Sequence, residues 1–483
     1  MKLKDLLKDI KVIEICADLE MEIPAIIYDS RKVTEGSLFV AISGFASDGN
    51  RFIPMAMEKG AAVVVTAKKP NLDVPYVLVE NDRLALAMLG TNFYGHPAAS
   101  MTMIGVTGTN GKTSSTLLLK QVLEKTLGAK VGLIGTMENL VGDEVIPTER
   151  TTPESLELQA LFARMRDAGC THVVMEVSSH ALVLDRVGGV HFNVAAFTNL
   201  TEDHLDFHKT MDEYCAAKAM LFERCDKAVI NTDDFYSIYM VEKAPHDTVT
   251  VSLTGNGDLN GVYPEYHAEG VSFEVVGGLD DRWEVNIPIP GKFTVYNAMT
   301  VLGIAKQLGI SLEDASKALA TVQGVKGRIE VVPTPGKDYS VLIDYAHTPD
   351  GLDNVLRSVR DFCKGRLISV FGCGGDRDPI KRPIMGEIGV RLSDIAIITS
   401  DNPRTEEPQA IIDDILKGVD PSKGEYISIC DRRTAIRYAM DIAEKDDIIV
   451  LAGKGHETYQ EINGKKYHLD EREEVAAHLQ ELR

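Results

Sequence analysis

A short glycine-containing segment has the residue types that bind nucleotide phosphates. Residues 102–106 before it are apolar and predict a buried strand, and residues 114–123 after it predict a helix. In a strand–loop–helix unit the loop N–H groups and the helix N-terminus face the anion, a lysine adds positive charge and a threonine hydroxyl can bind Mg²⁺. Val106 stands where the strict pattern has its first glycine, so this is a relative of that pattern. The segment consists of Gly108, Thr109, Asn110, Gly111, Lys112 and Thr113.

Two further polar residues follow apolar runs and have the chemistry of metal ligands. Glu176 comes directly after residues 173–175, and with Thr113 it could hold Mg²⁺ against nucleotide phosphates. The alternative is a carboxylate that stabilises a helix N-terminus. His204 lies among carboxylates in residues 203–208, where a metal site or a phosphate contact competes with a purely structural histidine. We favour a functional role for both residues.

Lys218 lies in an apolar helical segment, residues 214–222. The simplest interpretation is a surface lysine whose alkyl chain packs on apolar neighbours. A buried lysine, however, has a lowered pKa, and its neutral amine can take up CO₂ to give a carbamate. That reaction would turn a cation into an anionic Mg²⁺ ligand. The residues alone leave both interpretations open.

Two arginines in the last third of the chain are suited to carboxylates, because a guanidinium group matches a carboxylate with two parallel hydrogen bonds. Arg377 follows a glycine-rich turn, and Arg404 ends the segment Asp-Asn-Pro-Arg at residues 401–404. This segment offers a carboxylate, an amide and a guanidinium within four residues, a mixture that suits a zwitterionic amino acid. Asn-Pro is also an ordinary turn signal.

Composition excludes several classes of protein. The 483 residues carry a net charge of −21, which argues against non-specific binding to nucleic acids or anionic membranes. The charge does not argue against small anionic substrates as partners, because local lysines, arginines and helix termini determine such sites. The seven cysteines are scattered without a C-x-x-C pair, so neither a zinc site nor a disulfide framework is indicated. The N-terminus lacks a leader-like apolar region, and no apolar stretch is long enough to span a bilayer. We expect a cytoplasmic monomer.

Strand-like and helix-like segments alternate along the chain, which predicts an α/β fold with mostly parallel sheets. Breaks at residues 92–97 and 323–328 indicate three domains, residues 1–98, 99–330 and 331–483. Open parallel sheets bind ligands at the carboxyl ends of their strands, and six apolar runs are followed by polar, often glycine-rich segments. These runs are residues 173–175, 195–197, 341–343, 367–371, 395–398 and 448–451.

With these motifs the chain resembles the Mur ligases, ATP-dependent enzymes that build the stem peptide of peptidoglycan. The resemblance runs nearly end to end and is strongest for the members that add the third residue to UDP-N-acetylmuramoyl-L-alanyl-D-glutamate. It implies an N-terminal UDP-binding α/β domain, a central P-loop ATPase-like domain with a mostly parallel sheet, and a C-terminal Rossmann-like α/β domain. The shared motifs, in order, are residues 28–31, 108–113, 151–155, 176–180, 198–208, 214–218, 344–347, 374–381, 401–404 and 453–457.

The resemblance implies roles for individual positions. The UDP-linked substrate would contact the loop 44–50 and Tyr28, Ser30, Thr151, Thr152, Ser178 and Arg186. ATP would contact residues 108–113 together with Asn297, Arg328 and Asp344. Mg²⁺ would be bound by Thr113, Glu176, His204 and Lys218, and the catalytic residues would be Lys112, His204 and Lys218 as its N6-carboxy form. The incoming diamino acid would contact Arg377, Asp401, Asn402, Pro403, Arg404, Gly453 and Glu457.

The implied reaction has two steps. The D-Glu side-chain carboxylate attacks the γ-phosphate of ATP, and the amine of the diamino acid then displaces phosphate from the acyl phosphate. In the family, the Asp-Asn-Pro-Arg form accompanies meso-2,6-diaminopimelate, whereas lysine-adding members usually lack this arginine. A buried guanidinium would pair with the extra carboxylate of diaminopimelate and repel a lysine ammonium. Arg404 and Asn402 are therefore the expected specificity residues, and Glu457 the expected ammonium partner.

Four alternatives stay open at this point. The same ligase could add L-lysine, or the chain could be a folylpolyglutamate-synthetase-like ligase, which would not explain the motif at residues 28–31. A P-loop kinase would not explain the arginines and glycine loops of the last domain. A regulator that has lost catalysis should also have lost Lys112, Glu176, His204 or Lys218, and all four are present.

Overall fold

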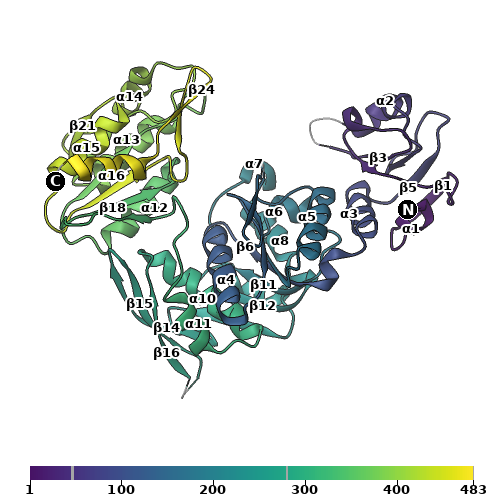
Figure 1. Cartoon of the computed structure of the whole chain (residues 1–483), viewed down its shortest axis with the longest axis horizontal. Helices are drawn as coiled ribbons and strands as arrows, with labels where there is room; N and C mark the ends of the chain where they lie inside the picture. Colours follow the sequence, from purple (N-terminus) through teal and green to yellow (C-terminus); the bar gives the residue numbers. More distant parts are fainter. Residues whose placement is uncertain (45–47, 149, 279–280, 482–483) are drawn as a thin grey trace. The chain divides into compact units, whose positions relative to one another are not determined.

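The computed structural model describes residues 1–44, 48–148, 150–278 and 281–481. Contacts divide the chain into two compact units. The first unit comprises Met1–Ser252, Asn256–Asp258 and Thr300–Ser311, and the second comprises Leu253–Gly255, Leu259–Met299 and Leu312–Arg483. Many of the helices and strands of both units are labelled in Figure 1.

The first unit begins with a small sheet in the order β1-β5-β4-β3-β2, in which only β1 is antiparallel to its neighbour. Alternate residues of β3 lie in different cores: Leu38 and Val40 pack on one face, and Phe39 and Ala41 on the other. Both faces are therefore covered, as parallel strands require. The elements are α1 (Leu3–Leu6), β1 (Val12–Cys16), β2 (Ile26–Ile27), β3 (Leu38–Ala41), α2 (Ile53–Glu58), β4 (Val63–Thr66), β5 (Tyr76–Val79) and α3 (Asp82–Phe93).

A second sheet of the first unit runs in the order β13-β12-β11-β6-β10-β7-β8-β9 and is parallel from β13 to β7. β6 lies between β10 and β11, so the strand order reverses at β6. Open parallel sheets bind ligands at such a reversal point. The strands are β6 (Thr102–Thr107), β7 (Val131–Ile134), β8 (Asn139–Val141), β9 (Glu144–Ile146), β10 (His172–Glu176), β11 (Phe192–Phe197), β12 (Cys225–Asn231) and β13 (Thr248–Ser252). The helices are α4 (Lys112–Leu127), α5 (Ser155–Asp167), α6 (Ser179–Val183), α7 (Leu205–His208), α8 (Met211–Ala219) and α9 (Ser237–Lys243).

The second unit contains an antiparallel ladder and a doubly wound sheet in the order β17-β18-β22-β19-β20-β21, parallel except for β17. Residues of α12, α13 and α14 fill one core, and residues of α15 and α16 fill the other. The ladder consists of β14 (Leu259–His267), β15 (Gly270–Val276) and β16 (Arg282–Ile287). It is followed by α10 (Lys292–Gln307), whose residues from Thr300 on belong to the first unit, and by α11 (Leu312–Leu319).

In the remaining part of the second unit, strands and helices alternate from β18 to β22, with a further strand before this run and two strands and a helix after it. The elements of this part are β17 (Glu330–Val332), β18 (Ser340–Asp344), α12 (Pro349–Arg360), β19 (Leu367–Phe371), α13 (Lys381–Leu392), β20 (Ile395–Ile398), α14 (Pro408–Leu416), β21 (Glu425–Ser428), α15 (Arg432–Ile442), β22 (Ile448–Ala452), β23 (Tyr459–Ile462), β24 (Lys465–His468) and α16 (Glu471–Glu481).

The α/β class with mostly parallel sheets is confirmed. The runs 367–371 and 395–398 form β19 and β20 with the expected bounds. The helix expected at residues 114–123 is longer and begins at Lys112, directly after the last glycine of the phosphate-type segment. The small sheet and the sheet around β6 belong to one compact unit, because α3 packs against α5.

Candidate functional site

The segment after β6 forms a tight loop that ends at the N-terminus of α4. The Nζ atom of Lys112 donates hydrogen bonds to the carbonyl oxygens of Gly108 (2.8 Å) and Thr109 (2.9 Å). The N–H of Asn110 donates to Oδ1 of Asn199, which follows β11, at 2.9 Å. The loop is thus fixed to the neighbouring strand, and a helix N-terminus without a capping side chain is a site that attracts anions.

Glu176, the last residue of β10, is 1% exposed and held by neutral donors. Its Oε1 accepts hydrogen bonds from Oγ1 of Thr113 (2.9 Å) and from the N–H of Thr136 (2.8 Å), and its Oε2 accepts from Oγ1 of Thr136 (3.0 Å). None of these donors carries a charge. A buried carboxylate in such surroundings suits a cation beside the Thr113 hydroxyl.

Lys218 lies on α8 and is almost completely buried. Its Nζ atom donates to the carbonyl oxygen of Gly108 at 2.8 Å, the same oxygen that accepts from Lys112, and lies 4.4 Å from the ring centre of Tyr214. Burial is the main cause that lowers the pKa of Lys218 well below its usual range, and the charge of Lys112 lowers it further. The surface-lysine interpretation is therefore wrong, and the amine is in surroundings that favour its neutral form.

His204 precedes α7 in a left-handed backbone conformation, and its side chain is half exposed. Its ring contacts the ring of His180 edge-on, with centres 5.0 Å apart, and its Nε2 lies 3.5 Å from Asp203. Among the described residues no group of three or more His, Cys, Asp or Glu side chains could hold a metal ion. A metal at this loop therefore needs ligands of other kinds, such as a hydroxyl or a carbamate.

Polar residues that the sequence connects with the UDP-linked substrate converge beside β10. The hydroxyl of Thr152 donates to the carbonyl oxygen of Glu176 (2.9 Å) and accepts from the N–H of Ser178 (3.2 Å). Nη1 of Arg186 donates to the carbonyl oxygen of Thr152 (3.2 Å), and its Nε faces Glu154 at 3.4 Å. Thr152, Ser178 and Arg186 thus form one cluster.

The other residues of this group lie around it. Oγ1 of Thr151 is 3.0 Å from Oγ1 of Thr136, which also binds Glu176. Tyr28 donates to Glu157 of α5 at 2.6 Å, and burial raises the pKa of its hydroxyl. Ser30 is buried in a short 3₁₀ turn, and within the described part of the chain its side chain makes no hydrogen bond to the cluster. Residues 45–47 of the loop 44–50 lie outside the described residues.

In the second unit, residues after β20 and β22 meet as the sequence predicts. Nδ2 of Asn402 donates to Oε2 of Glu457 at 2.8 Å. Nζ of Lys454, which is fully buried, contacts both Oδ1 of Asn402 and Oε2 of Glu457 at 3.1 Å. Asp401 is also buried, and its Oδ2 atom has no hydrogen-bond partner among the described residues. This unpaired oxygen is an acceptor for a bound donor such as an ammonium group.

The two predicted carboxylate-binding arginines differ in how firmly they are held. Nη1 of Arg404 donates to the carbonyl oxygen of Gly375 at 2.7 Å, and its Nε lies 3.5 Å from Glu461. Arg377 is exposed, and its Nη1 donates a long hydrogen bond, 3.4 Å, to the carbonyl oxygen of Asp376. Both flank the glycine turn after β19, and Arg404 is the more firmly held of the two. Pro403 is buried beside it.

The positions predicted to contact ATP outside the phosphate loop also lie in the second unit. The buried carboxylate of Asp344 accepts hydrogen bonds from the N–H groups of Ile329 (2.8 Å) and Ala346 (2.9 Å), and burial raises its pKa. The guanidinium of Arg328 lies over the ring of Tyr345 at 5.5 Å. Asn297 is buried on α10.

Sequence reasoning missed three residues that hold the predicted ones. Thr136 binds both oxygens of Glu176, Lys454 binds Asn402 and Glu457, and the N–H of Glu461 donates to Oδ1 of Asn402 at 2.9 Å. Lys454 lies inside a motif that the sequence singled out, so it could have been found. Thr136 and Glu461 carry no comparable signal.

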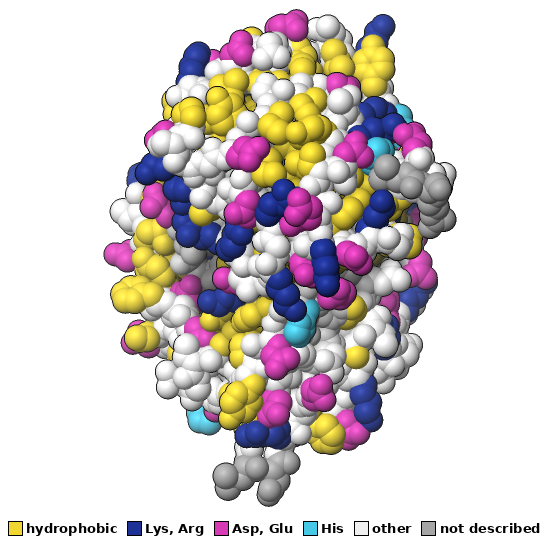
Figure 2. All heavy atoms as spheres, turned by 90° about the vertical axis from the view of Figure 1, so that its left-hand side faces the viewer, with side chains coloured by type: hydrophobic (Ala, Val, Ile, Leu, Met, Phe, Trp, Pro, Cys, Tyr) yellow, Lys and Arg dark blue, Asp and Glu magenta, His cyan; other side chains and the backbone are white. Residues whose placement is uncertain are grey.

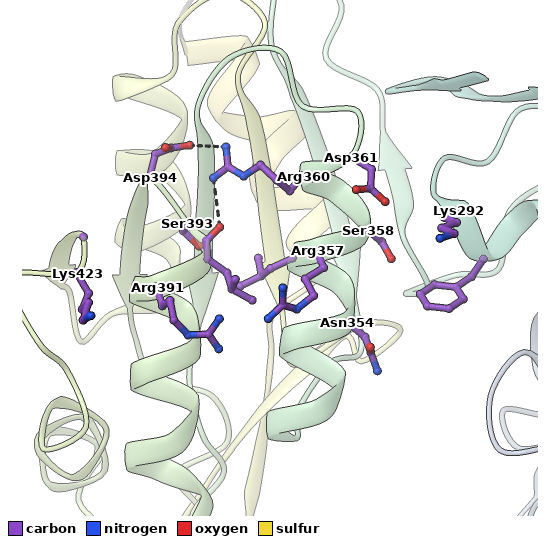
Figure 3. A pocket seen from close by; sticks show the side chains of 14 residues that line it. Lys292, Asn354, Arg357, Ser358, Arg360, Asp361, Arg391, Ser393, Asp394 and Lys423 are labelled. Atoms are coloured by element: carbon purple, nitrogen blue, oxygen red, sulfur yellow. Dashed lines mark hydrogen bonds and ion pairs between the residues drawn. The ribbon is translucent and has the colours of Figure 1, made fainter. Parts of the chain in front are cut away.

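A cavity of about 710 Å³ lies elsewhere in the second unit, where α12 and α13 end. Figure 3 shows its basic side chains, and three of them are held by carboxylates: Arg357 and Arg391 share Asp353, and Arg360 pairs with Asp394 at 2.8 Å. The cavity borders the N-terminal end of β20, whereas residues 401–404 follow the C-terminal end of that strand. It is therefore not part of the candidate site.

The surface and the helices add two observations. The face drawn in Figure 2 carries acidic and basic side chains interspersed with scattered apolar ones. Among the described residues, no helix combines the length and the apolar character needed to cross a bilayer.

Comparison with known proteins gives matches to three family models: "Mur ligase family, catalytic domain" over residues 22–94, "Mur ligase middle domain" over 106–305, and "Mur ligase, glutamate ligase domain" over 327–455. Proteins named UDP-N-acetylmuramoyl-L-alanyl-D-glutamate--2,6-diaminopimelate ligase from Clostridium tetani and Clostridium acetobutylicum are each 50% identical and aligned over 100% of both chains. A solved structure with the same name is 31% identical, with a TM-score of 0.77 over 100% of this chain and 99% of the other.

Proposed function

The chain belongs to the Mur ligase family, and from this premise we propose that it joins meso-2,6-diaminopimelate to the D-Glu residue of UDP-N-acetylmuramoyl-L-Ala-D-Glu at the expense of ATP. The observation that carries the proposal is the 50% identity, over the full length of both chains, to ligases named for this reaction. The arrangement of Arg404, Asn402 and Glu457 supports the choice of diaminopimelate.

The reaction begins at the D-Glu side chain. Its carboxylate oxygen attacks the γ-phosphorus of ATP, the bond to the bridging oxygen breaks, and ADP leaves. The amine of diaminopimelate then attacks the acyl carbon, loses a proton and displaces inorganic phosphate. Attack of one anion on another needs charge neutralisation and alignment more than it needs a base. Lys112 supplies positive charge at the phosphate loop, because its ammonium group already lies against the loop carbonyl oxygens.

ATP binds to residues 108–113, and the family resemblance adds Asn297, Arg328 and Asp344 as nucleotide contacts. Mg²⁺ accompanies ATP, and Thr113, Glu176, His204 and a carbamylated Lys218 would hold it. The buried carboxylate of Glu176, held only by neutral donors, fits this group. When bound, the cation neutralises charge on the phosphate oxygens.

The carbamate on Lys218 forms when the neutral amine attacks CO₂ and loses a proton. Two observations support it: the burial of the amine, and its shared hydrogen-bond acceptor with Lys112. A carbamate would replace a buried cation by an anion beside Lys112, which removes the repulsion between two ammonium groups. Lys112, His204 and Lys218 are thus the catalytic residues of the proposal.

The UDP-linked substrate contacts Tyr28, Ser30, Thr151, Thr152, Ser178 and Arg186. The cluster of Thr152, Ser178 and Arg186 directly beside Glu176 supports this assignment, because it lets one substrate reach from the first sheet to the metal ligands.

The diamino acid contacts Arg377, Asp401, Asn402, Pro403, Arg404, Gly453 and Glu457. Arg404 pairs with the distal carboxylate of diaminopimelate. The unpaired Oδ2 of Asp401 accepts from an ammonium group, and Glu457 offers a second carboxylate. Lysine lacks the distal carboxylate and would place an ammonium against Arg404.

The domain limits are 1–98, 99–330 and 331–483, and the three matched family models support this division. A cytoplasmic location is supported by seven cysteines that are all free thiols, as in a reducing compartment. The protein acts as a monomer, which light scattering would test.

The decisive assay measures ADP release with UDP-N-acetylmuramoyl-L-Ala-D-Glu and either meso-diaminopimelate or L-lysine. We expect release to require the UDP-linked dipeptide and diaminopimelate together. Stimulation by lysine would retain the ligase and overturn the specificity. Glutamate addition to a folate would indicate the folylpolyglutamate-type alternative, and ADP release without double dependence would overturn the ligase itself.

A further inference from the structure

Two loops that the proposed function assigns to different substrates lie in direct contact within the second unit. One is the nucleotide-side loop, residues 327–329, whose Ile329 N–H binds Asp344. The other is the amino-acid-side loop, residues 453–457. A Cβ atom added to Gly327 would stand 2.4 Å from the carbonyl carbon of Gly455 and from the N–H nitrogen of His456. The backbones therefore touch where only glycine, here with φ of +71°, leaves room.

Backbone hydrogen bonds join the same two loops to β18. The N–H of Tyr345 donates to the carbonyl oxygen of Gly327 at 2.8 Å, and the N–H of Gly453 donates to the carbonyl oxygen of Asp344 at 3.0 Å. Because both loops are bonded to residues 344 and 345, a displacement of either loop is transmitted to these two residues and from them to the other loop.

One side chain from the C-terminal helix α16 fixes this contact. Arg472 donates from Nε to Oε1 of Glu330 at 2.7 Å and from Nη2 to Oε2 of Glu330. The same Nη2 atom donates to the carbonyl oxygen of Gly455 at 3.1 Å, while Oε2 of Glu330 accepts from the N–H of Gly327 at 2.6 Å. Arg472 and Glu330 thus bridge Gly327 to Gly455 by a continuous chain of hydrogen bonds.

We propose that Arg472 is a positioning residue that couples the nucleotide-side loop to the amino-acid-side loop, so that ATP and diaminopimelate each strengthen the binding of the other. This inference rests on the proposed function. The first ligand fixes the shared backbone, so the second binds to a loop that is already ordered. The coupling is reciprocal, because it is a single free energy between two sites. In this proposal Arg472 acts through Glu330 and Gly455, its hydrogen-bond partners, and not by binding a substrate.

The test measures the dissociation constant of meso-diaminopimelate by calorimetry, with and without a non-hydrolysable ATP analogue. The full-length enzyme is used with Mg²⁺ and the UDP-linked dipeptide. In the wild type we expect the analogue to tighten binding at least about fivefold, the lower end of typical allosteric couplings. The ratio of the dissociation constants without and with the analogue should fall to about one in Arg472→Gln. Arg472→Lys keeps the positive charge but not the two-pronged guanidinium, and its ratio should lie between those of the wild type and Arg472→Gln.

Arg437→Gln is the matched control, because Arg437, like Arg472, ties α16 to another element. Arg437 lies on α15 and pairs with Glu481 of α16 at 2.9 Å, and its partners among the described residues lie outside both loops. Arg437→Gln should keep the wild-type ratio, which separates coupling from mere stability of α16. If Arg472→Gln does not fold, Glu330→Gln tests the other half of the bridge and should lower the ratio.

Each outcome decides the inference. A wild-type ratio of one, or an unchanged ratio in Arg472→Gln and Glu330→Gln, overturns the role of Arg472. If the same wild-type sample still makes the tripeptide product, the ligase proposal survives that result. If diaminopimelate neither binds nor yields product, the proposed function fails and the inference falls with it.

Discussion

At the scale of single residues, the arrangement of two lysines around one carbonyl oxygen is the most informative. Lys112 and Lys218 both donate to Gly108, although one begins α4 and the other lies on α8. Burial and the neighbouring charge both disfavour the ammonium form of Lys218, and the pKa is lowered accordingly. The protein therefore holds this lysine in an environment that costs stability unless its charge is lost or reversed.

Replacing Lys218 by methionine should stabilise the first unit in CO₂-free buffer at pH 7. The folded-state pKa of Lys218 is lower than the unfolded value near 10.5, so between the two the unfolded chain binds more protons. Wild-type stability therefore rises with pH across that window. The advantage of Lys218→Met should shrink as the pH approaches 10.5, and a gain of about 1 kcal/mol would raise the unfolding temperature by roughly 2–4 °C.

Lys120→Met is the control for this experiment, because Lys120 is also buried but pairs with Glu124 at 2.5 Å. That variant should be less stable than the wild type. Adding bicarbonate, a source of CO₂ for the carbamate on Lys218, should raise the ligase activity of the wild type but not that of Lys218→Met. An advantage of Lys218→Met that does not change with pH would contradict the argument.

Arg404 decides the second prediction at this scale. Arg404→Ala should raise the KM for meso-diaminopimelate by about 10- to 100-fold, the equivalent of one charge-assisted hydrogen bond. The KM for ATP should change little. Arg360, the last residue of α12, pairs with Asp394 just before β20, away from residues 401–404. Arg360→Ala should therefore leave the KM values for diaminopimelate and ATP unchanged. Steady-state kinetics with both substrates measures the effect, and an unaltered preference over lysine would refute the assignment.

At the scale of elements, the candidate residues lie where parallel strands end. β6, β10 and β11 are neighbours in one sheet, so the residues that follow them share one edge. β18, β22, β19 and β20 are neighbours in another and bring residues 344, 453–457 and 401–404 to one edge. Side-chain chemistry from distant parts of the sequence is collected there because parallel strands point in the same direction.

The turn after β6 depends on a glycine, and its substitution tests this element. A Cβ atom on Gly108 would stand 1.9 Å from Oγ1 of Thr198, at a φ of +146°. Gly108→Ala should therefore displace the phosphate loop and weaken ADP binding by at least about tenfold, or 1.4 kcal/mol.

Gly128→Ala provides the comparison for Gly108→Ala. Gly128 ends α4 at a φ of +60° with nothing within 4 Å of the added Cβ atom. The Gly128→Ala variant should lose about 1 kcal/mol of stability through backbone strain and bind ADP as tightly as the wild type. Equal ADP affinities in the two variants would contradict the role of the loop.

At the scale of the whole molecule, the chain has separate cores in two compact units. Each core is built from residues of its own unit. Units with their own cores should unfold independently.

Differential scanning calorimetry should accordingly resolve two transitions. Leu356→Ala, in the core beside α12, should lower only one transition, and Leu158→Ala, in the core beside α5, should lower only the other. Each fully buried leucine should cost about 2–5 kcal/mol. A single transition lowered by both variants would show that the units unfold together.

The sequence by itself determined the fold class, the position of the phosphate loop and the family. Alternation of apolar runs and polar segments is a local property, so β19 and β20 could be predicted with their bounds. The residue order around Lys112 and Thr113 likewise carries its chemistry within six positions. The resemblance supplied the roles of single positions, which periodicity does not contain.

Only the tertiary structure decided which groups hold these residues. Lys218 could have been a surface lysine, and its burial against Gly108, 110 positions away, follows from the packing of α8. Thr136 meets Glu176 because β7 and β10 are neighbours, and Arg472 meets Gly455 because α16 packs with α15 on one face of the sheet. Partners of this kind depend on which distant segments pack together, and local spacing carries no information about that.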